Sequence, residues 1–252
     1  MHPYLVHSGH FLLPTFGVLA AAGLMGALTL SLSTAATAGL NPEALWNAGL
    51  FTILSAFVLS RLLLVLSNLH SFLSYPILLL MVPSLTATGL LLTAIVTALY
   101  LRLRHLPLLP TLDAWAPCAT LVWAFLALGH FAEGSDAGLP TTLPWGVRIP
   151  PAPYRLHPVA LYAAIAAILL TLVLLRHLAR RQRPGDTFVL ALAATGTIQF
   201  LLTFFRQPNT TIDPPALYIL DILDPIQWIS LGMILTAGLI LLQPRKLVSH
   251  AV

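Results

Sequence analysis

Seven stretches of the chain are each long and apolar enough to cross a lipid bilayer as a helix. A helix needs about 20 predominantly apolar residues to span the hydrocarbon core of a membrane. The stretches are residues 11–33, 44–66, 75–100, 114–132, 156–178, 187–205 and 225–243. Because the segments between them are polar or rich in proline, the pattern predicts an all-α integral membrane protein with about seven transmembrane helices.

The small share of charged residues supports lipid as the main solvent of this chain. Only 8% of the 252 residues are charged, whereas about a quarter of the residues of a soluble domain are charged. No polar segment is long enough to form a separate domain, so we expect a single transmembrane domain over residues 1–252. The net charge is only +4 and no basic stripe with interleaved aromatic residues is present, which argues against a nucleic-acid partner.

The distribution of Lys and Arg between the loops predicts the orientation of the chain. Eight of these residues fall on one side of the membrane: Arg102, Arg104, Arg176, Arg180, Arg181, Arg183, Arg245 and Lys246. The opposite side holds three, which are Arg148, Arg155 and Arg206. Because the more positive side is cytoplasmic, we expect the N-terminus outside and the C-terminus in the cytoplasm. The long loops 133–155 and 206–224 then face outward.

Arg61 is the clearest polar residue inside a predicted span. Charged side chains in a bilayer are costly and usually reach the interface or a partner. Arg61 lies near the outer end of the second span. Its side chain either extends to the interface along its apolar stem or binds a lipid phosphate through its planar guanidinium fork. Both interpretations stay open on the sequence.

Residues 129–141 end the fourth span and gather polar groups in a short segment. The segment holds His130, Glu133 and Asp136 among three glycines. One interpretation is a glycine-rich helix end with solvated charges. The other is an interfacial site in which His130 or Glu133 moves a proton.

Three further polar positions lie at the outer ends of spans. His157 precedes Pro158 at the start of the fifth span, which predicts a helix beginning with Pro158 in its first turn. Arg206 ends the sixth span and either binds a headgroup phosphate or marks the interface. Asp224 beside Pro225 predicts the capped start of the last span, with Gln227 in its first turn. None of the common catalytic, metal or phosphate-binding motifs is present, so we expect no metal and no cofactor.

Taken in order, these motifs resemble those of the bacterial prolipoprotein diacylglyceryl transferases. The family signature is Gly-Arg-x-Gly-Asn-Phe-x-Asn-Gly-Glu-x-x-Gly-x-Pro-Thr. Six residues fall in step with it: Gly129, Phe131, Gly134, Gly138, Pro140 and Thr141. Other family motifs match Phe16-Gly17, Arg61, His157-Pro158 with Leu161-Tyr162, Phe204-Phe205-Arg206-Gln207-Pro208, and Gln227 with Ser230.

The resemblance implies an enzyme that transfers diacylglycerol from phosphatidylglycerol to the lipobox cysteine thiol of a prolipoprotein signal peptide. It also implies a bacterial plasma (inner) membrane protein in contact with membrane lipid, whose active face is turned toward the periplasm or cell exterior. The thiolate is the nucleophile, and charge on the leaving glycerol phosphate requires cations. The candidates for the catalytic base are His130, Glu133 and His157. The implied phospholipid-binding residues are Arg61, Arg206, Gly138, Gln199 and Gln227.

Several polar or charged positions of the family pattern hold other residues in this chain. The signature Arg falls on Ala127, the first signature Asn on His130 and the signature Glu on Ser135. Elsewhere, a family His falls on Thr88, an Arg and Glu pair of the sixth span falls on Gln199 and Thr203, and a Tyr falls on Phe16. Neutral side chains cost far less than charges inside a membrane.

Two functions therefore remain open, and a third is disfavoured. In the first, Arg61 and Arg206 hold phosphate while His130, Glu133 or His157 replaces the missing base, as imidazole can near neutral pH. In the second, a non-catalytic relative binds phospholipid or a lipoprotein precursor without turnover. A small-solute transporter is disfavoured because the sequence shows no internal repeat and no paired interrupted spans.

The orientation is testable with reporter fusions. A green fluorescent protein fused after Val252 is expected to fluoresce, because the positive side of the chain stays in the cytoplasm. Alkaline phosphatase inserted after Arg148 is expected to be active, because that loop is exported. Activity in the reverse pattern would contradict the predicted orientation.

Overall fold

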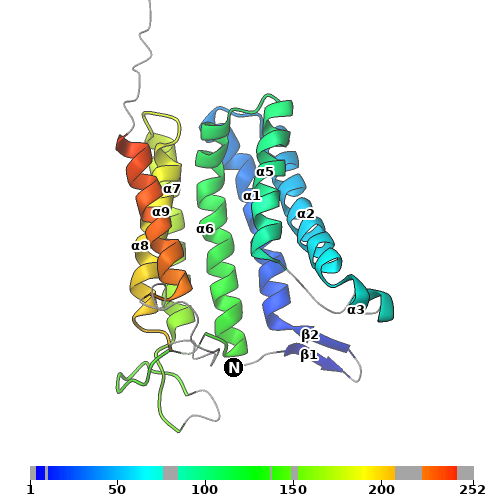
Figure 1. The fold of residues 1–252 in the computed structure, drawn as a ribbon. Coiled ribbons are helices and arrows are strands. Elements are labelled where there is room, and N and C mark those ends of the chain that lie inside the picture. Colours follow the sequence, from blue (N-terminus) through cyan, green and yellow to red (C-terminus); the bar gives the residue numbers. More distant parts are fainter. Residues whose placement is uncertain are drawn as a thin grey trace, which may run out of the picture. The chain divides into compact units, whose positions relative to one another are not determined.

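The computed structural model describes residues 4–8, 11–75, 85–136, 138–148, 153–207 and 223–242, and most of them are helical (Figure 1). Six helices are long and apolar enough to cross a membrane: α1 Thr15–Ala38, α2 Pro42–Ser67, α6 Leu108–Glu133, α7 Val159–Arg180, α8 Asp186–Thr203 and α9 Pro225–Leu242. A seventh apolar helix, α5 Ala87–Leu103, is shorter. The chain is therefore an all-α, multi-pass integral membrane protein, as the sequence predicts.

The first predicted span begins too early. Residues Phe11–Pro14 form the strand β2, which pairs in antiparallel fashion with β1, Tyr4–Ser8. Helix α1 starts only at Thr15. A short apolar run can be strand or helix, and hydropathy alone does not distinguish them.

The third and fourth spans also differ from the predicted bounds. Residues 69–74 form the short helix α3, Leu69–Ser74, and α5 begins at Ala87, whereas the sequence predicted one helix from residue 75. Residues 76–84 of that prediction lie outside the described part of the chain. Helix α6 begins six residues before the predicted 114, and His105 in the preceding turn has a left-handed φ of 54°.

The residues just before α2 and α7 fix where these helices begin. The side chain of Asn41 accepts hydrogen bonds from the backbone of Glu43 and Ala44 at 2.9 and 3.2 Å, which caps α2 ahead of Pro42. The predicted start of α7 is one residue early, since Pro158 is the N-cap and the helix begins at Val159. Here the backbone N–H that proline lacks is not needed.

The chain divides into two compact units. Residues 28–114 form one unit, in which α2 packs on α5 and the Thr97 hydroxyl donates to Thr52 at 3.2 Å. Residues 1–27 and 115–252 form the other, in which α8 packs on α7 and α9. The expectation of one domain over residues 1–252 stays a prediction.

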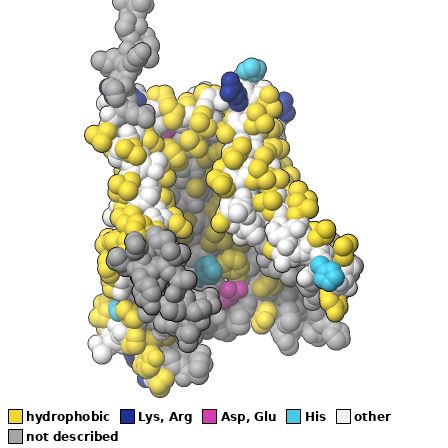
Figure 2. Space-filling model, in the orientation of Figure 1, with side chains coloured by type: hydrophobic (Ala, Val, Ile, Leu, Met, Phe, Trp, Pro, Cys, Tyr) yellow, Lys and Arg dark blue, Asp and Glu magenta, His cyan; other side chains and the backbone are white. Residues whose placement is uncertain are grey.

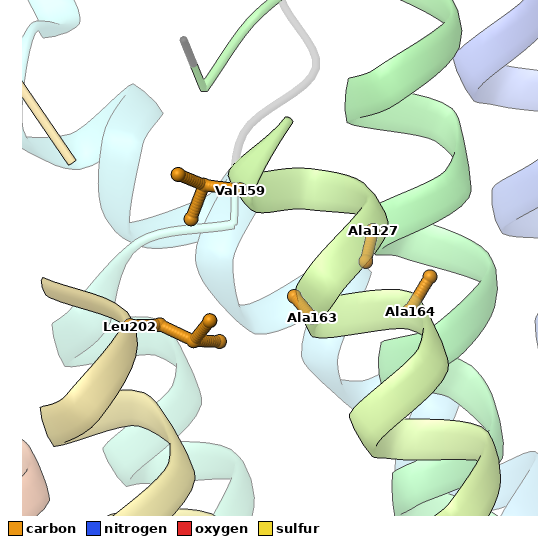
Figure 3. Packing of buried hydrophobic residues seen from close by; sticks show 5 residues of the cluster. All are labelled: Ala127, Val159, Ala163, Ala164 and Leu202. Carbon is orange, nitrogen blue, oxygen red and sulfur yellow. The ribbon is translucent and has the colours of Figure 1, made fainter. Parts of the chain in front are cut away.

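Small side chains build the contact between α6 and α7. Ala127, Ala163 and Ala164 lie in one buried cluster with Val159 of α7 and Leu202 of α8 (Figure 3). In a bilayer the hydrophobic effect does not drive helices together, so helix pairs depend on close packing, which small residues allow. Hydrophobic side chains instead cover the flanks of the helices, and the visible Lys and Arg atoms lie near helix ends (Figure 2).

Replacing Ala164 by Leu is expected to destabilise the protein. The side chain is buried between helices, and overpacking a well-filled core costs about 1–3 kcal/mol. Unfolding in a detergent titration measures the change. The neighbouring Ile165→Leu is the control, because Ile165 is 51% exposed and its replacement should leave the transition in place.

Candidate functional site

Backbone hydrogen bonds join three segments that are distant in the sequence. The Gly138 N–H donates to the His157 carbonyl at 3.1 Å, and the His157 N–H returns to the Leu139 carbonyl at 3.0 Å. The Leu139 N–H donates to the Phe205 carbonyl at 2.8 Å, and Gly138 pairs with Arg206 as a β-bridge. The structure therefore brings together Gly138, His157 and Arg206, three of the residues predicted for the site.

The close approach of these segments requires glycine at position 138. A Cβ atom there would lie 2.5 Å from the His157 carbonyl oxygen and 2.7 Å from the Val159 side chain. Four residues earlier, Gly134 has a φ of 78° and its N–H donates to the His130 carbonyl at 3.0 Å. This left-handed glycine ends α6, so the predicted glycine-rich helix stop is confirmed.

Arg206 forms an ion pair with Asp136, which the sequence interpretation did not assign to the site. Its Nε lies 2.9 Å from one Asp136 oxygen and its Nη2 donates to the other at 3.0 Å. The two side chains are only 18% and 23% exposed, so this carboxylate is not a simple solvated charge. The Nη2 hydrogen bond and the opposite charges hold the guanidinium beside the carboxylate, while Nε is buried and donates no hydrogen bond among the described residues.

The sequence contains one indication that Asp136 belongs to the site: it directly follows the position where the family signature has Glu. The family Glu falls on Ser135, and Asp136 supplies an acid one residue later. Asp136 has a φ of 61°, a left-handed conformation that Asp tolerates better than most residues. A sequence pattern does not reveal such a turn, so its pairing with a residue seventy positions away was missed.

His157 belongs to a small aromatic and polar network. Its Nδ1 lies 3.3 Å from the Tyr162 hydroxyl, which accepts a hydrogen bond from Trp145 Nε1 at 2.9 Å. The His157 ring also meets the Phe205 ring edge-on at a centroid distance of 5.3 Å. In the tautomer that donates from Nδ1 to Tyr162, Nε2 is an acceptor available for a proton.

His130 lies at the end of α6 in a separate set of contacts. Its Nδ1 is 2.9 Å from the Ser135 hydroxyl, which donates to the His130 carbonyl at 3.3 Å. Because that hydroxyl uses its proton on the carbonyl, it accepts from Nδ1 and leaves Nε2 as an acceptor. The Phe16 ring lies 4.9 Å from the imidazole. Glu133 is exposed one turn further on.

Gln227 and Thr203 connect the end of α8 to the start of α9. The Gln227 amide donates to the Thr203 hydroxyl at 2.9 Å, and its oxygen accepts from the Asp224 backbone at 3.0 Å. The second bond is the reciprocal half of a capping box, which supports the predicted helix start at Asp224. A phospholipid contact by Gln227 stays a prediction, and it would have to add to these bonds or replace one.

Gln199 and Ala127 show what replaces the charges of the family pattern. Gln199 lines a cavity of about 200 Å³ between α6, α8 and α9, together with Trp123, Thr195 and Met233. Its side-chain oxygen is buried and has no hydrogen-bond partner among the described residues. Ala127 is part of the apolar cluster between α6 and α7 (Figure 3). Neither position needs a counter-charge.

Arg61 belongs to the unit of residues 28–114 and is described with it. The guanidinium lies 5.9 Å from the centre of the Phe72 ring in α3, a distance at which a cation is attracted to an aromatic face. Thr88, where the family has a His, is exposed and donates weakly to Thr86 at 3.4 Å. A shared phosphate site for Arg61 and Arg206 stays a prediction.

These features define a multi-pass membrane protein with a polar site at the ends of three helices. Residues 3–243 match the family model for prolipoprotein diacylglyceryl transferase. The chain therefore belongs to the prolipoprotein diacylglyceryl transferase family, as the motifs predict.

Individual relatives carry the name phosphatidylglycerol–prolipoprotein diacylglyceryl transferase. The protein of Clostridium tetani is 26% identical over 198 residues, covering 76% of this chain and 80% of that protein. The protein of Chlorobaculum tepidum is 33% identical over 49% of this chain and 44% of that protein. The protein of Geobacter sulfurreducens is 32% identical over 58% of each chain. The chain thus spans most of the first relative and about half of the other two.

Replacing Gly138 by Ala is expected to separate the segments that carry His157 and Arg206. The new methyl group would overlap the His157 carbonyl, and relieving such overpacking costs about 1–3 kcal/mol. The melting temperature in detergent measures the effect. Gly232→Ala in α9 is the matched control, because its Cβ meets nothing within 4 Å and alanine favours a helix by about 1 kcal/mol. A melting temperature that falls equally in both variants would contradict the assignment.

Proposed function

We propose that the protein is a phosphatidylglycerol–prolipoprotein diacylglyceryl transferase. The observation that carries the proposal is the joining of three family motifs, at Gly138, His157 and Arg206, by backbone hydrogen bonds into one site. The family match over residues 3–243 supports the same activity. The substrates are then phosphatidylglycerol and the signal peptide of a prolipoprotein with a lipobox cysteine.

The proposed reaction is a displacement at the glycerol carbon that carries the phosphate. The cysteine thiolate attacks that carbon, a carbon–sulfur bond forms, and the carbon–oxygen bond to the phosphate breaks. Glycerol phosphate leaves with the electron pair, and the thiol proton goes to a base of the protein. The product is a thioether between the cysteine and diacylglycerol.

Arg206 is proposed to stabilise the leaving phosphate. Asp136 accepts one proton of Nη2 and lies against Nε, which donates no hydrogen bond among the described residues, so the Nη1 side of the guanidinium remains available as a donor. A phosphate bound there receives charge-assisted hydrogen bonds where negative charge develops. Asp136 then acts as a positioning residue that holds the guanidinium plane.

His157 is the proposed proton acceptor. It is hydrogen-bonded to the same segment that meets Arg206, and the Tyr162 hydroxyl orients its ring. His130 and the exposed Glu133 are the alternative bases at the end of α6. No hydrogen bond or ion pair of these two side chains with His157 or Arg206 occurs among the described residues.

A non-catalytic relative is the second candidate function. The observation that favours it is the replacement of the family's charged positions by Ala127 in an apolar cluster and by Thr203 bonded to Gln227. Such a protein would bind phospholipid or a lipoprotein precursor at the same site. In either case we propose that the protein lies in the bacterial plasma (inner) membrane with this site toward the periplasm or cell exterior.

A mass assay with phosphatidylglycerol vesicles and a lipobox peptide tests the transferase. The wild type is expected to add the mass of diacylglycerol to the peptide. Removing the base in His157→Ala is expected to lower the rate about 100-fold, as for general acid–base groups elsewhere, and Arg206→Ala should do the same. Arg148→Ala is the control, because Arg148 is an exposed cation in the same loop region.

The outcomes separate the two candidates. Loss of rate in His130→Ala but not in His157→Ala would assign the base to His130 at the end of α6 instead of His157. Absence of product from the wild type, with phosphatidylglycerol retained through purification, would support the binding protein. A melting temperature measured for each variant separates loss of chemistry from loss of folding.

A further inference from the structure

A second polar cleft lies at the other end of α2 from Arg61. Its volume is about 250 Å³, and α2 and α5 supply its walls with the turns beside them. The lining residues are Asn41, Glu43, Ala44, Asn47, Tyr100, Arg104 and Leu106. Glu43 and Arg61 are about 27 Å apart along the helix axis at about 1.5 Å per residue. The cleft is therefore separate from any site that includes Arg61.

Arg104 supplies the positive charge of the cleft. Its guanidinium lies 5.6 Å from the centre of the Tyr100 ring, which orients it by a cation–π contact. The backbone of this corner is held by hydrogen bonds from Arg104 to Tyr100 and from Leu106 to Leu101, both 2.9 Å. No ion pair of Arg104 occurs among the described residues, so its charge is available to a ligand.

Glu43 supplies a negative charge in the same cleft. It lies in the first turn of α2, and no ion pair joins it to Arg104 or to another described residue. The Asn41 oxygen is committed to the helix cap, which leaves the Asn41 amide nitrogen as a donor. A cation with a nearby amide donor and a separate carboxylate therefore face one small volume.

We propose that this cleft binds the headgroup of a zwitterionic phospholipid with a primary ammonium group, such as phosphatidylethanolamine. The phosphate accepts hydrogen bonds from Arg104 and from the Asn41 amide, and the ammonium donates to the carboxylate of Glu43. A diester phosphate carries one negative charge and the ammonium one positive charge, which matches the two charges of the cleft.

The surroundings of the cleft favour a lipid over a soluble zwitterion. Leu99 and Leu103 of α5 are strongly exposed beside Tyr100 and Arg104. In a membrane protein such leucines contact acyl chains, while a tyrosine and an arginine at a helix end lie at headgroup depth. The same molecule can therefore place its chains on α5 and its headgroup in the cleft. Both leaflets contain headgroups, so the proposal does not depend on the orientation of the chain.

The chemistry of the carboxylate predicts which headgroup is preferred. A primary ammonium donates charge-assisted hydrogen bonds to Glu43, whereas the trimethylammonium of phosphatidylcholine has no N–H to donate. Phosphatidylethanolamine should bind more tightly than phosphatidylcholine by about tenfold, because only its ammonium group forms this charge-assisted hydrogen bond.

Native mass spectrometry of the full-length protein tests the proposal with dioleoyl phosphatidylethanolamine and dioleoyl phosphatidylcholine as probes. The wild type is expected to retain the first about tenfold better than the second. Arg104→Ala should reduce retention of both lipids, because both carry the phosphate. Arg102→Ala is the matched control, since Arg102 is exposed on the same turn of α5 but does not line the cleft.

A second variant and a competitor complete the test. Glu43→Gln should abolish the preference for phosphatidylethanolamine while both lipids still bind. Glycerophosphoethanolamine, which lacks acyl chains, should fail to displace the lipid at equal concentration. Equal loss of retention in Arg104→Ala and Arg102→Ala, an unchanged preference in Glu43→Gln, or displacement by the chain-free headgroup would overturn the proposal. Unchanged melting temperatures establish that the variants fold.

Discussion

The proposed chemistry depends on the backbone hydrogen bonds that join the segments around residues 138, 157 and 205. A loop at a membrane surface has many polar backbone groups, and each needs a partner. Here the partners are supplied by the other two segments, so the loop is ordered by the same bonds that position His157 and Arg206. Gly138 makes this arrangement possible, because any side chain at that position would push His157 away.

The bilayer made much of the fold predictable, because apolar length directly reports a spanning helix. The glycine-rich segment after the fourth span was equally informative, since a left-handed glycine such as Gly134 ends a helix through local geometry. The hairpin at Phe11–Pro14 was missed because a short apolar run does not distinguish strand from helix. Asp136 was missed because its partner Arg206 is distant in sequence, and only the folded chain brings the two together.

The neutral residues at positions where the family has charges illustrate the cost of a charge in a membrane interior. An isolated charge in a membrane interior is expensive, so a charge persists there only where it has a partner or a task. Ala127 packs among alanines, and Thr203 shares a hydrogen bond with Gln227. Arg206 keeps its charge and has Asp136 beside it. This ion pair thus lies at the helix ends, where water and headgroups reduce the cost of a charge.

Under the proposed function, the ion pair between Arg206 and Asp136 also determines how the site selects an anion. An approaching lipid meets a nearly neutral pair, so long-range attraction contributes little and salt should screen little of it. Selection then occurs at contact, where only a group shaped to reach the remaining guanidinium donors gains energy. The same weak field favours departure, because an expelled glycerol phosphate leaves a cation that already has a counter-ion. The Asp136 carboxylate would therefore favour both the recognition of a phosphate by its shape and the release of glycerol phosphate.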